Sequence, residues 1–349
     1  MSERAPSARE PAEGFNRAAD AGIHVLALPT PFLVGRVNCY LIEDSPLTLV
    51  DTGPNSGKSL DELQCALARH GRTIEELELV VLTHQHMDHI GLLEVIVRRS
   101  GADVAALDLL ATYLENFSAN AAADDAFAQQ VMRRHGVPDD VATVLGSVGA
   151  AFRAFGSSGH VTQQLRNCET LTLRDRRLRV FHRPGHSPTD TIFWDEERQI
   201  LLAGDHLLAR ISSNPLLSRP LTDDQPERSH ALLDYMDSMR STAQLPAELV
   251  LGGHGEPVLD HVKLIEERFR MHERRARKVL RVLGSESMTA FEIALGMWGN
   301  VAVTQAYLTL SEVLGHLDLL LRDGRAEEEQ HDGISRFRAV SKPHATVSA

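Results

Sequence analysis

A short segment near residue 84 concentrates the residue types that bind metal ions. The sequence LTHQHMDHIG places His84, His86, Asp88 and His89 close together, directly after the apolar run LELVVL. Neighbouring side chains of a strand point to opposite faces, so these four groups need a loop if they are to face one centre. Imidazole nitrogens and a carboxylate suit zinc and other first-row divalent ions. We therefore predict a divalent metal site here, with a plain polar loop as the alternative.

Three later segments each offer one more ligand after an apolar run. RPGHSP carries His186, LLAGDH carries Asp205 and LGGHGE carries His254. The apolar runs predict strands, and the loops that follow such strands gather at one edge of a sheet. Glycine beside each ligand permits close approach of the backbone. Each segment alone is typical of a structural turn, but together and in this order they predict one shared site.

Strands and helices must position these loops. Helical spacing of apolar residues predicts helices at 57–70 and 90–99, and the alanine-rich stretch of about 106–160 predicts a helical insertion broken at Gly136-Val137-Pro138. Short apolar runs punctuated by proline, glycine and aspartate predict strands within 23–51 and at 77–82, 169–173, 178–182, 191–194, 200–203 and 249–251. Alternation of this kind predicts an α/β fold.

The chain changes character after residue 262. A charged helical pattern covers 266–282, apolar helical patterns cover 291–297 and 303–321, and two strand-like segments flank Asp332-Gly333, a favoured hairpin turn. Helices followed by a hairpin predict a small winged-helix-like domain. We thus expect a disordered lead-in at 1–20, a main domain at 21–262 and a winged-helix-like domain at 263–349.

The order THQHMDH, PGHSP, AGDH and GGHG resembles the metallo-β-lactamase superfamily over residues 23–262. Asp51-Thr52-Gly53 is similar to that family's strand-end motif upstream of the histidine loop. The C-terminal module resembles the winged-helix extension of the β-lactamase-like protein 2 branch, and the chain also resembles hydroxyacylglutathione hydrolases. The resemblance implies a four-layer αββα sandwich for the main domain, interrupted by the helical insertion.

The resemblance also implies a site for two divalent ions. The ligands it implies fall into three groups: His84, His86 and His186 for one ion, Asp88, His89 and His254 for the other, and Asp205 as the bridge. Zinc is our first choice, with Mn²⁺ or Fe²⁺ as alternatives. Redox di-iron relatives carry glutamate at the position of His86, so histidine there favours hydrolysis. Asp88 is the expected catalytic residue, which orients a metal-bridging hydroxide.

Two side chains adjoin the expected ligands. His206 either donates a proton to the leaving group or packs beside the site, and we favour packing; Asp51 is expected to hold the histidine loop in place. Other histidines lack a partner pattern and are expected to be structural or at the surface: His160, His182, His230, His261 and His272.

The insertion carries aromatic residues that we expect to pack inside it. The alternative is an apolar wall over the metal cleft, which would suit acyl chains. The residues concerned are Tyr113, Phe117, Phe127, Phe152 and Phe155.

Composition narrows the location and the partners. The three cysteines, Cys39, Cys65 and Cys168, are isolated, which favours a reducing compartment. The N-terminal residues have no signal-peptide pattern, and no apolar run is long enough for a membrane span. We therefore predict a cytoplasmic protein without a membrane partner. A homodimer is a further prediction, with the C-terminal module either at its interface or packed on the main domain.

The charge of the chain favours some classes of function over others. The net charge of −12 disfavours extensive binding of nucleic acid without excluding it. The stretch 303–321 lacks basic residues, and the cations Arg270, Arg274, Arg275, Arg277 and Lys278 alternate with glutamates as on a solvated helix. We predict hydrolysis of a small ester, thioester or lactone. The alternatives are a phosphodiesterase or endoribonuclease, and a non-catalytic DNA-binding or regulatory protein.

Overall fold

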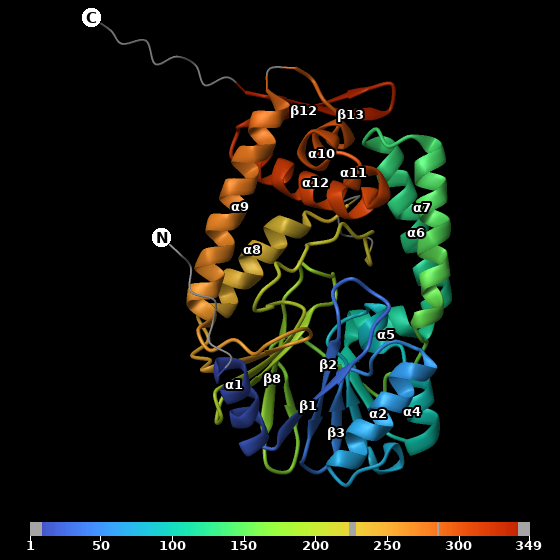
Figure 1. Cartoon of the computed structure of the whole chain (residues 1–349), viewed down its shortest axis with the longest axis vertical. Coiled ribbons are helices and arrows are strands. Elements are labelled where there is room, and N and C mark those ends of the chain that lie inside the picture. Colours follow the sequence, from blue (N-terminus) through green and yellow to red (C-terminus); the bar gives the residue numbers. More distant parts are fainter. Residues whose placement is uncertain (1–8, 223–227, 285, 341–349) are drawn as a thin grey trace, which may run out of the picture. The chain divides into compact units, whose positions relative to one another are not determined.

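The computed structural model describes residues 9–222, 228–284 and 286–340, which form two compact units (Figure 1). The first unit comprises the described residues within 1–121, 151–213 and 237–265, and the second those within 122–150, 214–236 and 266–349. The expected main domain, 21–262, thus contributes to both units, because parts of the insertion and residues 214–236 belong to the second.

The first unit contains two β-sheets. The larger has the order β1-β2-β3-β4-β5-β6, with β3 to β6 parallel and β1 and β2 antiparallel. Its strands are β1 (Ile23–Leu28), β2 (Val37–Ile42), β3 (Thr48–Val50), β4 (Leu79–Val81), β5 (Asp103–Leu107) and β6 (Gln163–Leu165). The predicted strands within 23–51 and at 77–82 are confirmed.

The second sheet has the order β11-β10-β9-β8-β7, in which only β10 and β11 run parallel. The predicted strands at 169–173, 178–182, 191–194, 200–203 and 249–251 are confirmed. They are β7 (Thr170–Thr172), β8 (Arg177–His182), β9 (Thr191–Asp195), β10 (Ile200–Gly204) and β11 (Leu249–Gly252).

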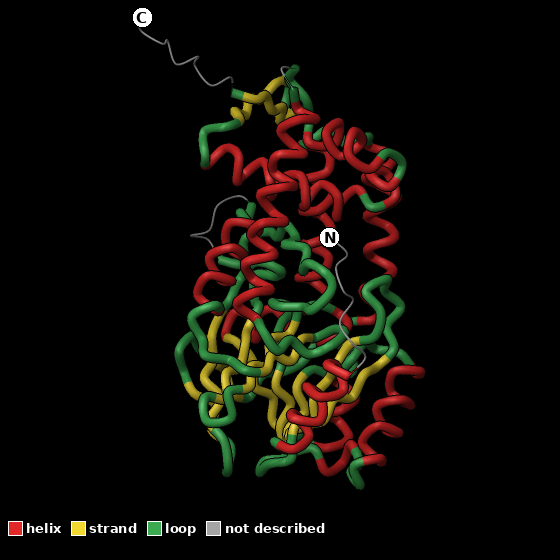
Figure 2. The backbone as a smooth tube through the Cα atoms, turned by 60° about the vertical axis from the view of Figure 1, so that its left-hand side comes forward, coloured by secondary structure: helices red, strands yellow, loops and turns green. Residues whose placement is uncertain are grey.

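One hydrophobic core lies between the sheets. It joins Tyr40 and Val81 of the first sheet to Val180, Phe193 and Leu202 of the second. Figure 2 shows the strands of this unit grouped together, with helices beside them. The mixed α/β sandwich is therefore as expected, and its packed faces explain the nearly continuous apolar runs of β9, β10 and β11.

Helices flank the sheets. Those of the first unit are α2 (Gly57–Arg69), α3 (Met87–Ile90), α4 (Leu93–Ser100) and α5 (Asp108–Glu115). The Ser56 side chain caps α2 by accepting a hydrogen bond from the Ser59 amide, and Leu63, Ala66 and Leu67 form its buried face. Three further helical segments complete the insertion: α6 (Phe117–Arg134), α7 (Asp139–Phe152) and the 3-10 turn η2 (Arg153–Phe155).

One expectation at the N-terminus was wrong. Residues 9–20, which we expected to be disordered, form the helix α1 (Arg9–Asp20), whereas residues 1–8 lie outside the described part of the chain. The cause is packing, because Ala18 is buried in the core and Phe15 packs against it. A composition rich in alanine, proline and charge concealed this apolar face.

The second unit contains helices and a β-hairpin. They are α8 (Ala231–Thr242), which it shares with the first unit, α9 (His261–Leu283), also shared, α10 (Ala290–Trp298), α11 (Val301–Thr304) and α12 (Ala306–Arg322), followed by β12 (Ala326–His331) and β13 (Ile334–Ala339). The hairpin turns at Asp332 and Gly333 with φ of 51° and 79°, as predicted. Its winged-helix character stays a prediction.

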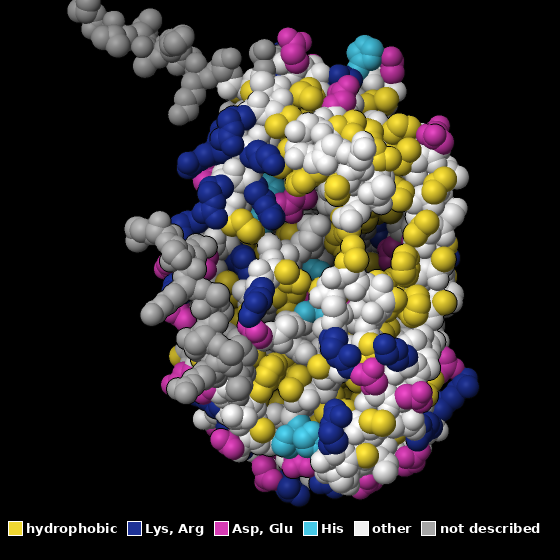
Figure 3. All heavy atoms as spheres, in the orientation of Figure 1, with side chains coloured by type: hydrophobic (Ala, Val, Ile, Leu, Met, Phe, Trp, Pro, Cys, Tyr) yellow, Lys and Arg dark blue, Asp and Glu magenta, His cyan; other side chains and the backbone are white. Residues whose placement is uncertain are grey.

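Helix α9 carries a basic surface in the second unit (Figure 3). Arg274 and Lys278 are exposed there, and Arg270 and Arg277 pair with Glu266 and Glu273 one turn earlier. These i,i+4 pairs are those of a solvated helix. Among the described residues, no helix combines the length and apolar character that crossing a membrane requires.

Candidate metal centre

The histidine loop leaves the middle of the larger sheet. Strand β4 lies between β3 and β5 and ends at Val81, and the chain then turns through His84 into the single helical turn α3. The amide of His89 donates to the carbonyl of His86 at 2.9 Å, which places Asp88 and His89 on that turn. Because β4 ends before His84, the imidazoles and the Asp88 carboxylate lie on a loop and a helical turn and can face one centre.

The second sheet brings the remaining ligand residues. His186 lies in the loop between β8 and β9, Asp205 follows β10 directly, and His254 follows β11. Because β10 and β11 are parallel neighbours, Asp205 and His254 leave the same edge of the sheet. The Gly253 amide donates to the Gly204 carbonyl at 2.7 Å and locks the two loops together.

All the predicted ligand side chains come together at this edge. The ligand atoms form three overlapping groups, within each of which they lie within 4.8 Å of one another. The groups are His84, His86 and His186; His84, His89 and Asp205; and Asp88, His89 and His254. Residues from both sheets are therefore assembled into one cluster of a kind suited to divalent metal ions.

Asp205 lies at the centre of this cluster. Its Oδ2 is 3.4 Å from Nε2 of His254 and 3.5 Å from Nε2 of His186, while its Oδ1 is 3.4 Å from Nε2 of His89. One carboxylate thus contacts imidazoles of both predicted ion sites. Burial raises the pKa of Asp205, but the imidazoles of His254 and His89 outweigh burial and hold it well below its ordinary value.

The donor atoms fit a cation. His84 Nε2 is completely buried and has no hydrogen-bond partner, while its Nδ1 lies 2.9 Å from the Thr83 hydroxyl. A buried polar atom without a partner costs free energy, and a metal ion at the cluster would satisfy it. Burial lowers the pKa of His86 to about 3, with His186 as the next cause, so this imidazole is neutral and able to ligate.

Hydrogen bonds outside the cluster fix the ring orientations. The His254 Nδ1 donates to the Arg36 carbonyl at 2.8 Å; since a carbonyl only accepts, Nε2 is left as the free ligand atom. In the same way, Nδ1 of His89 donates to Asp51 Oδ2 at 2.8 Å. Asp51 also accepts from the amide of Thr83 at 2.9 Å. The expectation that Asp51 holds the histidine loop is confirmed.

A second support was not predicted. Asp190 accepts hydrogen bonds from the Ser187 amide at 3.0 Å and hydroxyl at 2.9 Å, and so shapes the loop of His186. The Thr189 hydroxyl donates to the Gln85 side chain and ties this loop to the histidine loop. The segment SPTD contains the turn-forming types that make such contacts, but nothing in the sequence indicates that Gln85 is their partner.

His206 packs beside the cluster. It is completely buried, its Nε2 lies 2.9 Å from the Thr242 hydroxyl, and burial lowers its pKa to about 3. A neutral imidazole that contacts α8 suits the packing role that we favoured over proton donation. Among the other histidines, His182 donates to the Pro188 carbonyl at 2.8 Å, and His272 is buried in the second unit beside His316.

The aromatic residues of the insertion divide into two sets. Tyr113 and Phe117 are each 6% exposed and pack against each other with ring centroids 6.2 Å apart, as expected of internal packing residues. Phe127, Phe152 and Phe155 keep more exposed surface. Only Phe152 and Phe155 of this second set belong to the first unit, which holds the histidine and aspartate cluster.

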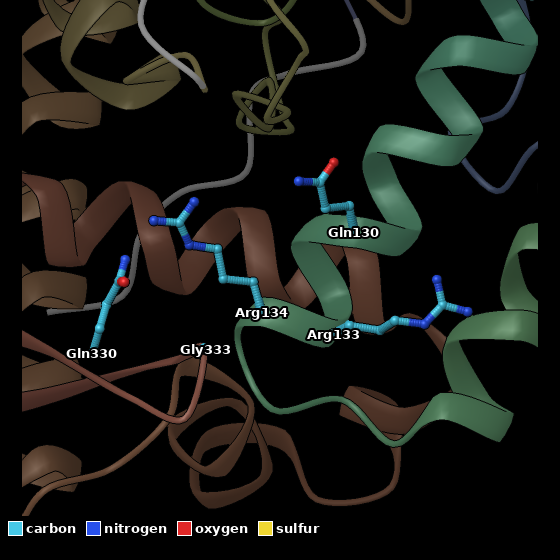
Figure 4. A pocket seen from close by; sticks show the side chains of 5 residues that line it. All are labelled: Gln130, Arg133, Arg134, Gln330 and Gly333. Carbon is cyan, nitrogen blue, oxygen red and sulfur yellow. The ribbon is translucent and has the colours of Figure 1, made fainter.

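The second unit has a hollow of its own, shown in Figure 4. Its lining residues are Gln130, Arg133, Arg134, Gln330 and Gly333. The Arg133 side chain pairs with Asp139, which is not a lining residue, with the nitrogen and oxygen 2.6 Å apart. These lining residues contribute no imidazole or carboxylate.

Comparison with known proteins gives a consistent result. A profile of the metallo-beta-lactamase superfamily matches residues 33–254. The probable metallo-hydrolase YqjP of Bacillus subtilis (strain 168) is 35% identical over 295 residues, which cover 84% of this chain and 91% of that protein. The beta-lactamase-like protein 2 homolog of Caenorhabditis elegans is 25% identical over 321 residues, 90% of this chain and 89% of that one. A crystal structure of a metallo-beta-lactamase family protein from Thermus thermophilus covers 91% of this chain and 99% of its own, with 27% identity and a TM-score of 0.75.

Proposed function

Because the chain belongs to the metallo-beta-lactamase superfamily, we propose that it is a dinuclear metal-dependent hydrolase of a small ester, thioester or lactone. The proposal rests on the position of Asp205, whose two carboxylate oxygens lie 3.4–3.5 Å from imidazoles of both triads of predicted ligands. One triad would be His84, His86 and His186, and the other Asp88, His89 and His254. A redox role is disfavoured because all the residues of the first triad are histidines.

The proposed chemistry is addition of water to an acyl carbon. Two divalent ions, when bound, lower the pKa of a shared water and polarise the substrate carbonyl. The C–O or C–S bond to the leaving group then breaks, the leaving group takes a proton, and a carboxylic acid and an alcohol or thiol result. The net charge of the chain favours such a substrate over a polyanion.

Asp88 is the proposed catalytic residue. It lies on α3 with Oδ2 3.4 Å from Nε2 of His254 and is nearly buried. Burial raises its pKa, but His89 and His254 outweigh this and lower it below the ordinary value, so the carboxylate is ionised at neutral pH. An ionised carboxylate at this point orients the attacking water and carries its proton toward the leaving group.

The test compares metal content and turnover in matched variants. We expect His84→Ala and Asp88→Ala to lower the metal content measured by elemental analysis and to reduce turnover on the order of 10³-fold. His160→Ala is the control, since that histidine is exposed and outside the cluster. Full turnover by either cluster variant would remove the basis of the proposal.

The substrate class needs a separate panel. Metal-loaded and chelated protein is offered esters, thioesters, lactones and a single-stranded RNA. Metal-dependent turnover of the acyl compounds is the expected result. Salt-sensitive cleavage of RNA without acyl turnover would instead favour the phosphodiesterase or endoribonuclease alternative. Elemental analysis of freshly purified protein distinguishes zinc from manganese and iron.

A further inference from the structure

The loop between β1 and β2 presents large apolar side chains to solvent. Leu33 is 95% exposed and Val34 is 38% exposed, while Phe32 beside them is half-buried. The loop is held in shape by local hydrogen bonds, because the Phe32 amide donates to the Thr30 hydroxyl at 3.1 Å. The loop therefore holds apolar surface in contact with water. A ligand that covered this surface would gain binding free energy from the burial.

Two aromatic side chains from the end of the insertion meet this loop. The ring centroid of Phe32 lies 5.6 Å from that of Phe152 and 6.1 Å from that of Phe155, and the last two are 6.1 Å apart. All three rings are only half-buried. These distances are those of packed aromatic groups. Together the residues form one apolar surface, the rim, made of Phe32, Leu33, Val34, Phe152 and Phe155.

The insertion side of the rim touches the turn that bears Asp88 and His89. The carbonyl of Phe155 accepts a hydrogen bond from the Asn55 amide at 2.8 Å. The backbone at Gly91, directly after α3, is so close to this carbonyl that a Cβ there would clash with it. The rim is therefore anchored beside the triad of Asp88, His89 and His254.

The loop side of the rim touches His254, which belongs to the same triad as Asp88 and His89. The Arg36 carbonyl, at the end of the loop, accepts the 2.8 Å hydrogen bond from His254, and Val37 forms a β-bridge with His254. The Arg36 side chain pairs with Glu62, so its charge is compensated. Apolar side chains and a compensated cation leave a surface that suits an uncharged alkyl group.

The distribution of exposed apolar residues supports this location. Among the described residues of the first unit, five large apolar side chains are exposed: Leu33, Val34, Ile211, Leu259 and Val262. Leu33 and Val34 belong to the rim. Ile211 lies in the loop that starts at Asp205, which the Ser213 hydroxyl closes by donating to the Asp205 carbonyl. Leu259 lies in the segment between His254 and α9, so four of the five lie on loops that start at or contact the cluster.

We infer that the rim binds the alkyl part of the substrate's acyl group while the scissile carbonyl lies at the cluster. The inference rests on the proposed acyl hydrolysis and narrows its substrates to acyl groups longer than acetyl. Full burial of a methylene group changes affinity about fourfold. Half-buried rings cover one side of a chain, so we expect about twofold per methylene, or about 60-fold between acetyl and octanoyl substrates.

The first experiment measures kcat/KM for 4-nitrophenyl esters and simple thioesters with acyl chains of increasing length. We expect Leu33→Asp and Phe32→Ala to reduce the preference for octanoyl over acetyl from about 60-fold to less than about 10-fold. Leu33 is exposed, so its replacement leaves the core intact. Val262→Asp is the matched control, since it also places a charge at an exposed apolar site of the same unit and should keep the preference.

The second experiment needs no turnover. Butyrate and octanoate are titrated into zinc-loaded protein by calorimetry, and octanoate should bind about 16-fold more tightly to the wild type but not to Leu33→Asp. If octanoate binds more tightly in a way that depends on Leu33, but no acyl compound is hydrolysed, the alkyl-binding role of the rim stands and the proposed reaction is refuted. A wild type without chain-length dependence in either experiment, or a dependence unchanged in Leu33→Asp, would overturn the inference.

Discussion

Replacing Asp51 with asparagine alters the carboxylate that organises the histidine loop while sparing the backbone. Asp51 has φ of 59°, in the left-handed region that asparagine tolerates and alanine does not. Both carboxylate oxygens are used: Oδ1 accepts from the Thr83 amide at 2.9 Å, and Oδ2 accepts from the Thr83 hydroxyl and from His89 Nδ1, each at 2.8 Å. An amide has only one oxygen for these three donors.

The expected loss of metal affinity follows from the position of the proton on the His89 ring. If the asparagine oxygen keeps the Thr83 amide, its NH₂ group faces Nδ1 of His89, which must then accept instead of donating. The proton moves to Nε2, and Nε2 can no longer ligate a metal ion. Loss of such an outer contact lowers metal affinity by about 10- to 100-fold. In free energy this is about 1.4–2.7 kcal/mol.

The assay is a titration of Zn²⁺ into chelator-treated protein in competition with a coloured chelator. Asp51→Asn should bind zinc about 10- to 100-fold more weakly than the wild type. Asp61→Asn, an exposed aspartate on α2, should bind as the wild type does. Urea unfolding of the ion-free variant checks that it is folded. Wild-type affinity in a folded Asp51→Asn protein would refute the role we assign to the Asp51–His89 contact.

Two further changes test the cluster. Gly253→Ala should abolish metal binding, because a Cβ there would overlap Asp205 Oδ1 and lie 2.7 Å from His89 Cε1. Gly57→Ala is the control and should bind metal normally, because the space around Gly57 is open. Normal metal binding by Gly253→Ala would contradict the geometry. In the ion-free protein burial lowers the pKa of His254, but Asp205 and Asp88 outweigh it and raise it to about 10. A raised pKa stabilises the fold below the unfolded value of about 6.5, and that stability is lost as the pH rises through the folded value. The free energy of unfolding of chelated protein, from urea titrations, should therefore fall between about pH 6.5 and pH 10, and zinc affinity should rise because binding displaces this proton; a flat profile for both would count against it.

The strands could be predicted because burial on both faces leaves a strong local pattern. The runs at 200–203 and 249–251 are apolar throughout, and both became strands of the second sheet. Strands β5 and β6 and helix α1 escaped prediction, and α1 and β6 did so for opposite reasons. Helix α1 has an apolar face too narrow to stand out from its charged composition, and β6 is so short that its only buried residue is Leu165.

Helix α8 was also not predicted, although its sequence carries apolar residues at helical spacing. Leu232, Tyr235 and Met239 are buried, and Ser238 donates to the Pro184 carbonyl at 2.7 Å. Four-residue spacing was present, but the preceding stretch of proline, serine and charged residues obscured the start of the helix. Propensity alone is a weak guide where tertiary contacts stabilise a short helix.

The identities of the site residues were available from the sequence, because ligand chemistry restricts which side chains can bind a divalent ion and glycines mark the turns that carry them. The order of the motifs also predicted that they share one site, but the geometry of that site depends on two sheets packing face to face and on the parallel pairing of β10 with β11. The contact of Phe32 with Phe152, and the backbone carbonyl of Arg36 that orients His254, also arise only from packing. A carbonyl is the same group in every residue, so its position in space, which no letter of the sequence encodes by itself, decides what it does.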